Sequence, residues 1–298
     1  MKRMVKFFCG LLVLGLALGI GGKAAGGGLY YYKDGHVEPL TWEEWHDRGG
    51  WHFGWFGGDR WELDHLDGLP SVSPAAKDWL DENEESFRDS VDDVPLSEAE
   101  CAAVRSVSMD LDSAACVIET GDRLSVATRK ARVRVDGSVL KIEAKKPSRP
   151  SSENSPRVLL TVPQGFRFQE FEIDAGAAAI EIDTLSCQEF DLDTGAASVE
   201  INSLTAREAS LDIGAGWMQA GYLDAQDVGL SCGTGAGDVT LAGRQDDYTL
   251  NAECAMGSLT LDGEPFLSGL SGDASTGHGA RKLDAGVGAG TLNLYFAD

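Results

Sequence analysis

From Val104 to the end of the chain, apolar and polar residues alternate, which is the pattern of β-strands with one buried face. The stretch SVSMDLD places Val107 and Leu111 on the same face. Further on, KARVRVDGSVLKIEAKK contains two alternating runs joined by Asp136 and Gly137, a dipeptide that favours a tight hairpin turn. We therefore expect an all-β domain with a β-hairpin near its start.

A longer pattern is superimposed on this alternation. The phrase IDAGAAAIEI begins at Ile173, and its copies LDTGAASVEI and LDIGAGWMQA begin nineteen residues apart, at Leu192 and Leu211. A fourth copy (LSCGTGAGDVTL) follows after nineteen residues, at Leu230, and a fifth (LNAECAMGSLTL) after twenty more, at Leu250. A last copy, LDAGVGAGTLNLYF, comes after an inserted loop at Glu264 to Arg281.

A constant period near 20 residues is typical of a solenoid, in which each unit buries its apolar face only by stacking on its neighbours. We predict a single-stranded parallel β-solenoid, or β-helix, with coils of about 19 to 21 residues. The short hairpin would cap it at the N-terminal end. An antiparallel sandwich is the competing fold, but its strands have no reason to repeat residue identities at fixed steps.

Stacked coils place equivalent residues about 4.8 Å apart, so we expect ladders of like side chains, with Phe171 beside Phe190. An isolated early copy, MDLDSAACVIET, superposes on FEIDAGAAAIEI without a gap. This superposition pairs Asp112 with Asp174, Ala114 with Gly176 and Ile118 with Ile180.

The phrase D-x-G-A predicts a corner between two walls of the coil. Gly176 is expected to adopt a positive φ, and Ala177 to fit the tight inside of the bend. Asp174, Asp193 and Asp212 precede the corner and point outward by the alternation. We expect these carboxylates to cap backbone N–H groups of the turn, and calcium binding is the alternative.

These residues resemble a known family. The ϕ-x-ϕ-D-x-G-A-x-x-ϕ-x-ϕ units, in which ϕ is apolar, the entry TVPQGF and the strand VDGSVLKIE are similar to the β-strand-repeat domain named "putative adhesin". That domain has no assigned function and is found in bacterial cell-envelope proteins, many with one N-terminal membrane span. The resemblance covers residues 104–298 and implies surface exposure. The loop at 264–281 and a Trp-rich segment before the domain depart from the family's pattern.

The chain begins with a basic segment followed by an apolar one. Lys2, Arg3 and Lys6 precede an almost uncharged run from Phe7 to Gly22, at the short end of what crosses a bilayer. We expect residues 1–28 to form a cytoplasmic tip and a transmembrane anchor in the cell membrane. By the positive-inside rule, the N-terminus is cytoplasmic and the rest of the chain extracellular. A cleaved signal peptide is the alternative, because GKAAGG offers small residues to a peptidase.

Residues 29–103 are expected to form an acidic juxtamembrane stalk and a spacer helix. The stretch TWEEWHDRGGWHFGWFGGDRWELDHLDG holds five of the seven Trp, a residue enriched at membrane interfaces. Ser73 and Pro74 can open the helix, and Ser97 to Glu100 has the form of a capping box. The three His of this stretch, His46, His52 and His65, lack the i, i+4 spacing of a compact metal site.

Composition excludes one class of partner and indicates little chemistry. A net charge of −23 argues against nucleic acid, since phosphate binding needs clustered Lys and Arg. The scattered cysteines of the exported part are expected to be buried free thiols. Glu181 and Glu200 would share one outward column, but His278, Arg281 and Lys282 gather only in the inserted loop. An enzyme acting on polysaccharide is therefore a minor alternative.

The sequence thus predicts a membrane-anchored, surface-exposed protein that binds or scaffolds a partner. We expect no catalytic residue, no cofactor site and no metal site. An extracellular glycan or a surface protein would be the ligand. A regulatory or envelope-stress accessory of another membrane protein is the alternative.

Overall fold

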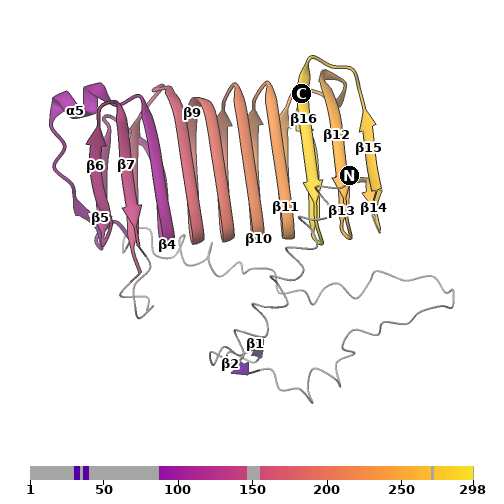
Figure 1. Ribbon diagram of the computed structural model, residues 1–298, viewed down its shortest axis with the longest axis horizontal. Coiled ribbons are helices and arrows are strands. Elements are labelled where there is room, and N and C mark those ends of the chain that lie inside the picture. The colour runs from indigo at the N-terminus through magenta and orange to yellow at the C-terminus, as the bar shows by residue number, and fades with distance from the viewer. Residues whose placement is uncertain (1–29, 34–35, 40–86, 146–154, 270–271, 298) are drawn as a thin grey trace. The chain divides into compact units, whose positions relative to one another are not determined.

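The computed structural model describes residues 30–33, 36–39, 87–145, 155–269 and 272–297 (Figure 1). The chain divides into two compact units, Met1–Asp67 and Gly68–Asp298. In the smaller unit, β1 (Tyr30–Lys33) and β2 (His36–Pro39) form an antiparallel pair. The predicted anchor, most of the stalk and all but the end of the spacer helix lie outside the described ranges. Within those ranges, no helix is long and apolar enough to cross a membrane.

The described part of the larger unit is almost entirely β-structure, which confirms the all-β prediction. Its elements are β3 (Asp92–Asp93), α5 (Glu98–Ala103), β4 (Ser106–Gly121), β5 (Ser125–Arg129), β6 (Arg132–Asp136), β7 (Val139–Ala144), β8 (Arg157–Pro163), β9 (Phe168–Thr205), β10 (Glu208–Asp224), β11 (Asp227–Ala242), the 3-10 turn η1 (Gln245–Asp247), β12 (Tyr248–Cys254), β13 (Ser258–Leu261), β14 (Glu264–Ser268), β15 (Gly272–Thr276), β16 (Arg281–Val287) and β17 (Thr291–Ala297).

Two local predictions are confirmed. Ser97 caps α5: its Oγ accepts a hydrogen bond from Glu100 N at 3.2 Å, and its own N–H donates to the Glu100 carboxylate at 2.9 Å. The Ser97 hydroxyl, which also donates to the Glu100 carboxylate at 2.7 Å, and the Ser97 N–H together lower the pKa of Glu100. The predicted hairpin is the antiparallel pair of β6 and β7, and Gly137 adopts a φ of 63° in its turn.

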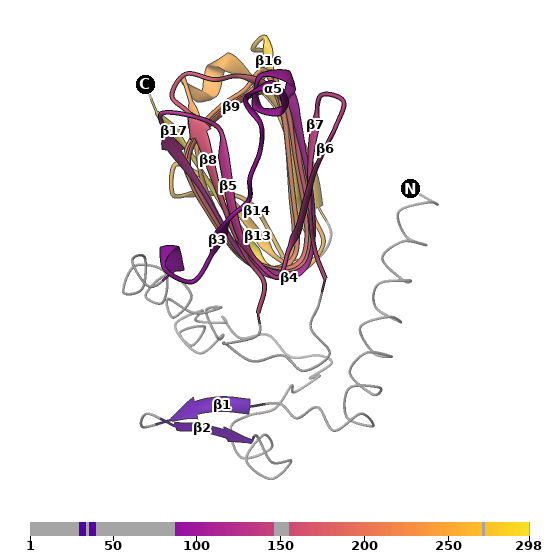
Figure 2. The same cartoon turned by 90° about the vertical axis from the view of Figure 1, so that its left-hand side faces the viewer.

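The strands form two walls that meet at a corner, as Figure 2 shows along the stack. Because β4, β9, β10 and β11 run along one wall, through the corner and along the other, both walls belong to one sheet. We call the wall that contains β6, β7, β16, β12 and β15 the first wall, and the wall that contains β3, β5, β8, β17, β13 and β14 the second wall.

In the middle of the sheet, pairing is parallel and follows the step predicted from the repeat. Glu208 lies beside Glu189 on one side and beside Asp227 on the other, a separation of nineteen residues each time. The ladder of like residues is also present, because the rings of Phe171 and Phe190 stack with centroids 6.2 Å apart. Inward residues of both walls form one continuous apolar core.

The ends of the sheet differ from the prediction of a wholly parallel stack. At the N-terminal end β7 and β8 pair with β4 in parallel, whereas β6, β5 and β3 add antiparallel strands. At the C-terminal end β14 and β15 are antiparallel to β13 and β12. The prediction of an inserted loop at Glu264 to Arg281 is therefore wrong, because this segment contains β14 and β15, which cap the stack. The sheet as a whole is mixed.

The order of the copies in space also differs from their order in the sequence. The last copy, β16 and β17, pairs with β11 of the fourth copy. The fifth copy, β12 and β13, pairs with β16 and β17 on their other side. The last copy therefore lies between the fourth and the fifth, and all three run parallel.

The predicted superposition of the early copy is two residues out of register. In the sheet Asp110, and not Asp112, lies beside Asp174, and Cys116 lies beside Ile180. A shift of two residues keeps every side chain on its own face, because side chains alternate with period two. The sequence pattern therefore could not separate the two registers.

The glycine of the D-x-G-A phrase serves close packing and does not adopt the positive φ that we predicted. Gly176, Gly195 and Gly214 are absent from the residues with positive φ. A Cβ on Gly195 would lie 2.7 Å from the carbonyl oxygen of Gly176, and a Cβ on Gly214 would lie 2.6 Å from that of Gly195. Ala177 is exposed, and Ala175 is the small residue buried beside the corner. Stacked backbones thus approach too closely there for any side chain.

The cysteines behave as the sequence predicted, as free thiols. Cys116, Cys187, Cys232 and Cys254 are buried and Cys101 is half-buried. Burial raises the pKa of the Cys116 and Cys187 thiols to about 12. Since the thiolate is the reactive form, Cys116 and Cys187 are inert core residues at neutral pH.

Candidate binding surface on the first wall

The outward side of the first wall carries rows of carboxylates. Two successive copies each present three acidic side chains at alternate positions of β9: Glu170, Glu172 and Asp174, then Glu189, Asp191 and Asp193. Asp174, Asp193 and Asp212 are strand residues here, and no hydrogen bond from a turn N–H reaches them within the described part of the chain. The predicted capping role is therefore wrong, because the alternation places these carboxylates on the wall and not in the bend.

Charge repulsion is strongest in the centre of these rows. The pKa of Asp191 is raised, first by partial burial and then by the negative charges of Glu172, Asp193 and Glu189. Basic side chains lie at the margins: Lys145 pairs with Asp110, and Lys282 Nζ lies 3.2 Å from Asp227 Oδ1. The wall therefore presents concentrated negative charge toward its middle.

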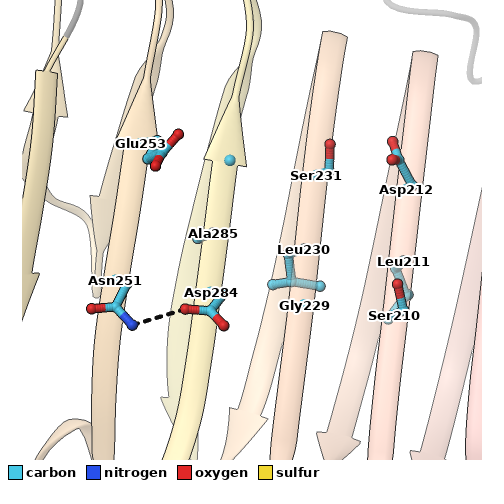
Figure 3. Close-up of a pocket in the computed structure, with 11 residues that line it drawn as sticks. Ser210, Leu211, Asp212, Gly229, Leu230, Ser231, Asn251, Glu253, Asp284 and Ala285 are labelled. Atoms are coloured by element: carbon cyan, nitrogen blue, oxygen red, sulfur yellow. Dashed lines mark hydrogen bonds between the residues drawn. The ribbon is translucent and has the colours of Figure 1, made fainter. Parts of the chain in front are cut away.

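Beside the carboxylate rows, the wall is hollowed at two glycines. Figure 3 shows the hollow across β10, β11, β16 and β12, and its volume is about 370 Å³. Gly229 and Gly286 leave it without side chains, and a Cβ on either would have no other atom nearer than 3.9 Å. The polar residues of its rim are Ser210, Asp212, Ser231, Asn251, Glu253 and Asp284.

Hydrogen bonds orient one side of this rim. Asn251 Nδ2 donates to Asp284 Oδ1 at 2.9 Å, as the dashed line in Figure 3 marks, and Ser275 Oγ donates to Asn251 Oδ1 at 2.9 Å. These two hydrogen bonds hold the Asn251 amide and the Asp284 carboxylate in fixed orientations in the absence of a ligand. The hollow therefore offers oriented acceptors and hydroxyl groups, which suit ligand groups that donate hydrogen bonds, such as ammonium and hydroxyl groups.

The acidic and basic residues that the sequence offered as candidates for a polysaccharide-active enzyme do not lie together in the structure. Glu181 and Glu200 are half-buried and lie on the second wall, beside Val117 and Gln219. Arg281 is held by contacts within the fold, and Lys282 pairs with Asp227 on the first wall. The acids and the bases considered in the sequence thus belong to different faces.

No metal centre is formed by the residues that the structure describes, where no three His, Cys, Asp or Glu side chains are placed to hold an ion. The stalk residues His46, His52 and His65 lie outside those ranges. Carboxylates on neighbouring strands project from a flat wall, so they do not converge on one point.

Sequence reasoning missed the hollow. Its signal is the pair Gly229 and Gly286, which occupy outward strand positions where Asp, Glu or Ser stand in other copies. Gly286 lies beside Ser231 only because the last copy is inserted next to the fourth. The two glycines therefore could not be placed in one hollow from the order of the sequence.

Comparison with known proteins shows remote likeness only. No protein-family profile matches the chain, and no curated protein matches it. A crystal structure of a "putative cell adhesion protein" from Clostridium sporogenes is similar with a TM-score of 0.38 and 10% identity, over 70% of this chain and 100% of that one. A "putative adhesin" from Bacteroides fragilis is similar with a TM-score of 0.38 and 14% identity, over 68% of this chain and 95% of that one. The function proposed below rests on this chain's own residues.

Proposed function

We propose that this protein is a membrane-anchored, surface-exposed β-solenoid that binds or scaffolds an extracellular partner, in an adhesin-like role and without catalysis. The observation that carries the proposal is the hollow at Gly229 and Gly286 on the first wall. Its oriented carboxylate and hydroxyl groups suit a partner that presents amino or hydroxyl groups. The adjoining rows of carboxylates would attract such a partner when it is basic.

A solenoid is supported by the nineteen-residue parallel steps between β9, β10 and β11 and by the glycines at the corner. Repeat proteins of this kind present long, regular surfaces that suit extended or large ligands. The antiparallel strands at both ends would act as caps on the stack, as terminal repeats commonly do.

Surface exposure and anchoring are supported by the sequence. The basic tip and the apolar run Phe7 to Gly22 would keep the N-terminus in the cytoplasm and place residues 29–298 outside. The resemblance of residues 104–298 to an envelope domain agrees with this arrangement.

A binding role without catalysis is supported by the form of the first wall. Catalytic carboxylate pairs need different environments, so that one group is protonated while the other is ionised. The carboxylates of the first wall stand in equivalent exposed positions, and the thiols of Cys116 and Cys187 are buried with a raised pKa.

The test is a binding screen with the full chain in lipid nanodiscs, against arrays of amino-sugar glycans and of lysine-rich surface proteins. Gly229→Gln would fill the hollow, because a side chain there meets open space. We expect this variant to lose about tenfold in affinity for the partner found, a typical effect at the centre of an interface. Ser108→Gln places the same side chain elsewhere on the first wall, removes no carboxylate, and is the control. Equal losses in both variants, or none in Gly229→Gln, would contradict the proposal.

A further inference from the structure

The second wall carries three aromatic side chains that are partly or well exposed to solvent. Trp217 is half-buried, and Tyr222 and Tyr295 are each 40% exposed. The register of β10 shifts against β11 between Ala220 and Leu223, so that two residues of β10 face Thr240 alone. This bulge places Tyr222 beside Thr240, whose other neighbour is Tyr295. The two tyrosines are therefore two strand spacings apart, about 10 Å.

The residues that flank Trp217 on the neighbouring strands are all small. Its neighbours across the strands are Ser198 on β9 and Ala236 on β11, and Thr291 follows on β17. The equivalent position in the other copies holds only small residues. A tryptophan standing on such a surface is a flat apolar platform with no core role to explain it.

A row of hydrogen-bonding side chains runs between Trp217 and the tyrosines. It consists of Gln219, Asp238, Asn293 and Thr260 on adjacent strands. Asn293 Nδ2 donates to Asp238 Oδ1 at 2.8 Å, and Thr260 Oγ1 donates to Asn293 Oδ1 at 2.8 Å. The amide and the carboxylate are thus held in one orientation.

Charge separates this surface from the first wall. Toward the N-terminal end, the same row contains the carboxylates of Glu181 and Glu200. From Gln219 toward the C-terminal end, Asp238 is the one carboxylate of the row among the described residues. The Asp238 carboxylate accepts a hydrogen bond from the Asn293 amide. A basic partner would be drawn to the first wall, and an anionic polymer would be repelled by the net charge of −23. An uncharged ligand suits this part of the second wall.

We propose that Trp217, Tyr222, Tyr295 and the row between them form a binding site for an extended, neutral, β-linked polysaccharide. The C–H face of a pyranose ring packs on an aromatic face, while its hydroxyl groups exchange hydrogen bonds with amide and carboxylate side chains. The spacing of the tyrosines is close to the length of a disaccharide unit in such a chain. This site is independent of the first-wall hollow and adds a glycan class to the binding role proposed above.

The test uses the full chain in lipid nanodiscs and neutral hexasaccharides of β-linked glucose, mannose and N-acetylglucosamine, with affinity measured by biolayer interferometry. We expect at least one of them to bind, and Trp217→Ala and Tyr295→Ala each to weaken it by about tenfold. Trp217→Phe is expected to retain most of the affinity, because it keeps an aromatic face. Met256→Ala, which removes an apolar side chain that is 58% exposed outside this site, is the control and should bind normally.

Three outcomes would overturn the proposal. The first is that none of the hexasaccharides binds. The second is that binding is unchanged in both Trp217→Ala and Tyr295→Ala, with circular dichroism confirming that these variants fold. The third is that a protein partner needs Trp217 and is not displaced by any hexasaccharide, which would make the surface a protein interface. The Gly229→Gln variant should bind the hexasaccharide normally, so failure of the hollow and failure of this site are distinguishable.

Discussion

The middle of the larger unit and its C-terminal end are built from the same repeat but are held together differently. In the middle, consecutive copies are neighbours, and large apolar side chains such as Phe171 and Phe190 stack in ladders. At the C-terminal end the inward positions include the small residues Ala252 and Ala285, and the last copy is inserted out of order. Repetition therefore specifies that copies stack, whereas the end needs further interactions that specify which copies are neighbours.

Those further interactions are polar and involve the inserted copy. Arg281 Nη1 lies 2.9 Å from Asp224 Oδ1 and donates to Ala242 O and to Tyr248 Oη at 3.1 Å each. One side chain thus joins the last copy to residues that come before and after it in space. Asn251 to Asp284 and Asn293 to Asp238 add one such bond on each wall.

The largest expected effect tests the apolar ladder in the middle. Phe190→Ala should lower the free energy of unfolding by about 4 kcal/mol, because it leaves a cavity beside Phe171 in the core. Leu250→Ala, in the fifth copy, should cost less, about 3 kcal/mol, since fewer buried atoms are lost. Urea unfolding of the full chain measures both. If Leu250→Ala were the more costly of the two, the middle would not be the more strongly packed region.

The next effect tests the glycine column at the corner. Gly214→Ala should lower stability by about 2 kcal/mol, because its Cβ would lie 2.6 Å from the Gly195 carbonyl oxygen and the stacked backbones would have to separate. Gly229→Ala is the matched control, since its Cβ would have no atom nearer than 4.0 Å. The control should be neutral or slightly stabilising. Equal thermal midpoints for the two variants would show that close approach is not the reason for glycine at the corner.

A smaller effect tests the polar bonds of the C-terminal end. Arg281→Met keeps much of the side-chain length but removes the ion pair and the hydrogen bonds, at a cost of about 2 kcal/mol or less. Hydrogen exchange should show the loss in β12 and β16, with protection in β9 unchanged. Uniform loss of protection in β9 as well would mean that the two regions unfold together.

The smallest effect is that of single Asp→Asn substitutions on the first wall. Such a substitution should stabilise the protein in the acidic rows of the middle and destabilise it at the C-terminal end. The raised pKa of Asp191 means that its ionised form disfavours the fold at neutral pH. Asp191→Asn should therefore stabilise the protein by about 0.5 kcal/mol at pH 7. A carboxyl group whose pKa is raised by folding stabilises the protein below its pKa in the unfolded state, and this contribution is lost as the pH rises through its pKa in the folded state. The stability that Asp191→Asn gains at pH 7 should therefore disappear near pH 3.

At the C-terminal end, Asp284→Asn is the counterpart of Asp191→Asn. It replaces the carboxylate that accepts from Asn251 Nδ2 by a neutral amide, whose oxygen is a weaker acceptor, so it should lower the thermal midpoint at pH 7. Calorimetry at pH 7 and pH 3 measures both variants. If both raised the midpoint equally, the hydrogen bonds at the end would contribute nothing against charge repulsion.

Features that depend on near neighbours in the chain could be predicted. The hairpin follows from Asp136 and Gly137, and the cap of α5 from Ser97 and Glu100, because each interaction joins residues a few positions apart. The alternation also identified the buried face correctly at Phe171, Ile173, Ile180 and Ile182. The hollow and the aromatic site could not be predicted, since each joins residues of copies whose spatial order differs from the sequence.

The sequence by itself determined the strands, their buried faces and the nineteen-residue step, because hydrophobic burial acts with the period of the strand and stacking repeats it. Three further features depend on contacts made in the folded protein: the register of the early copy, the place of the last copy between the fourth and the fifth, and the use of glycine for close approach at the corner. Alternating patterns are unchanged by a shift of two residues, and similar copies are nearly interchangeable as neighbours. The choice among them was therefore made by contacts between distant residues, such as Arg281 with Asp224 and Gly214 with Gly195.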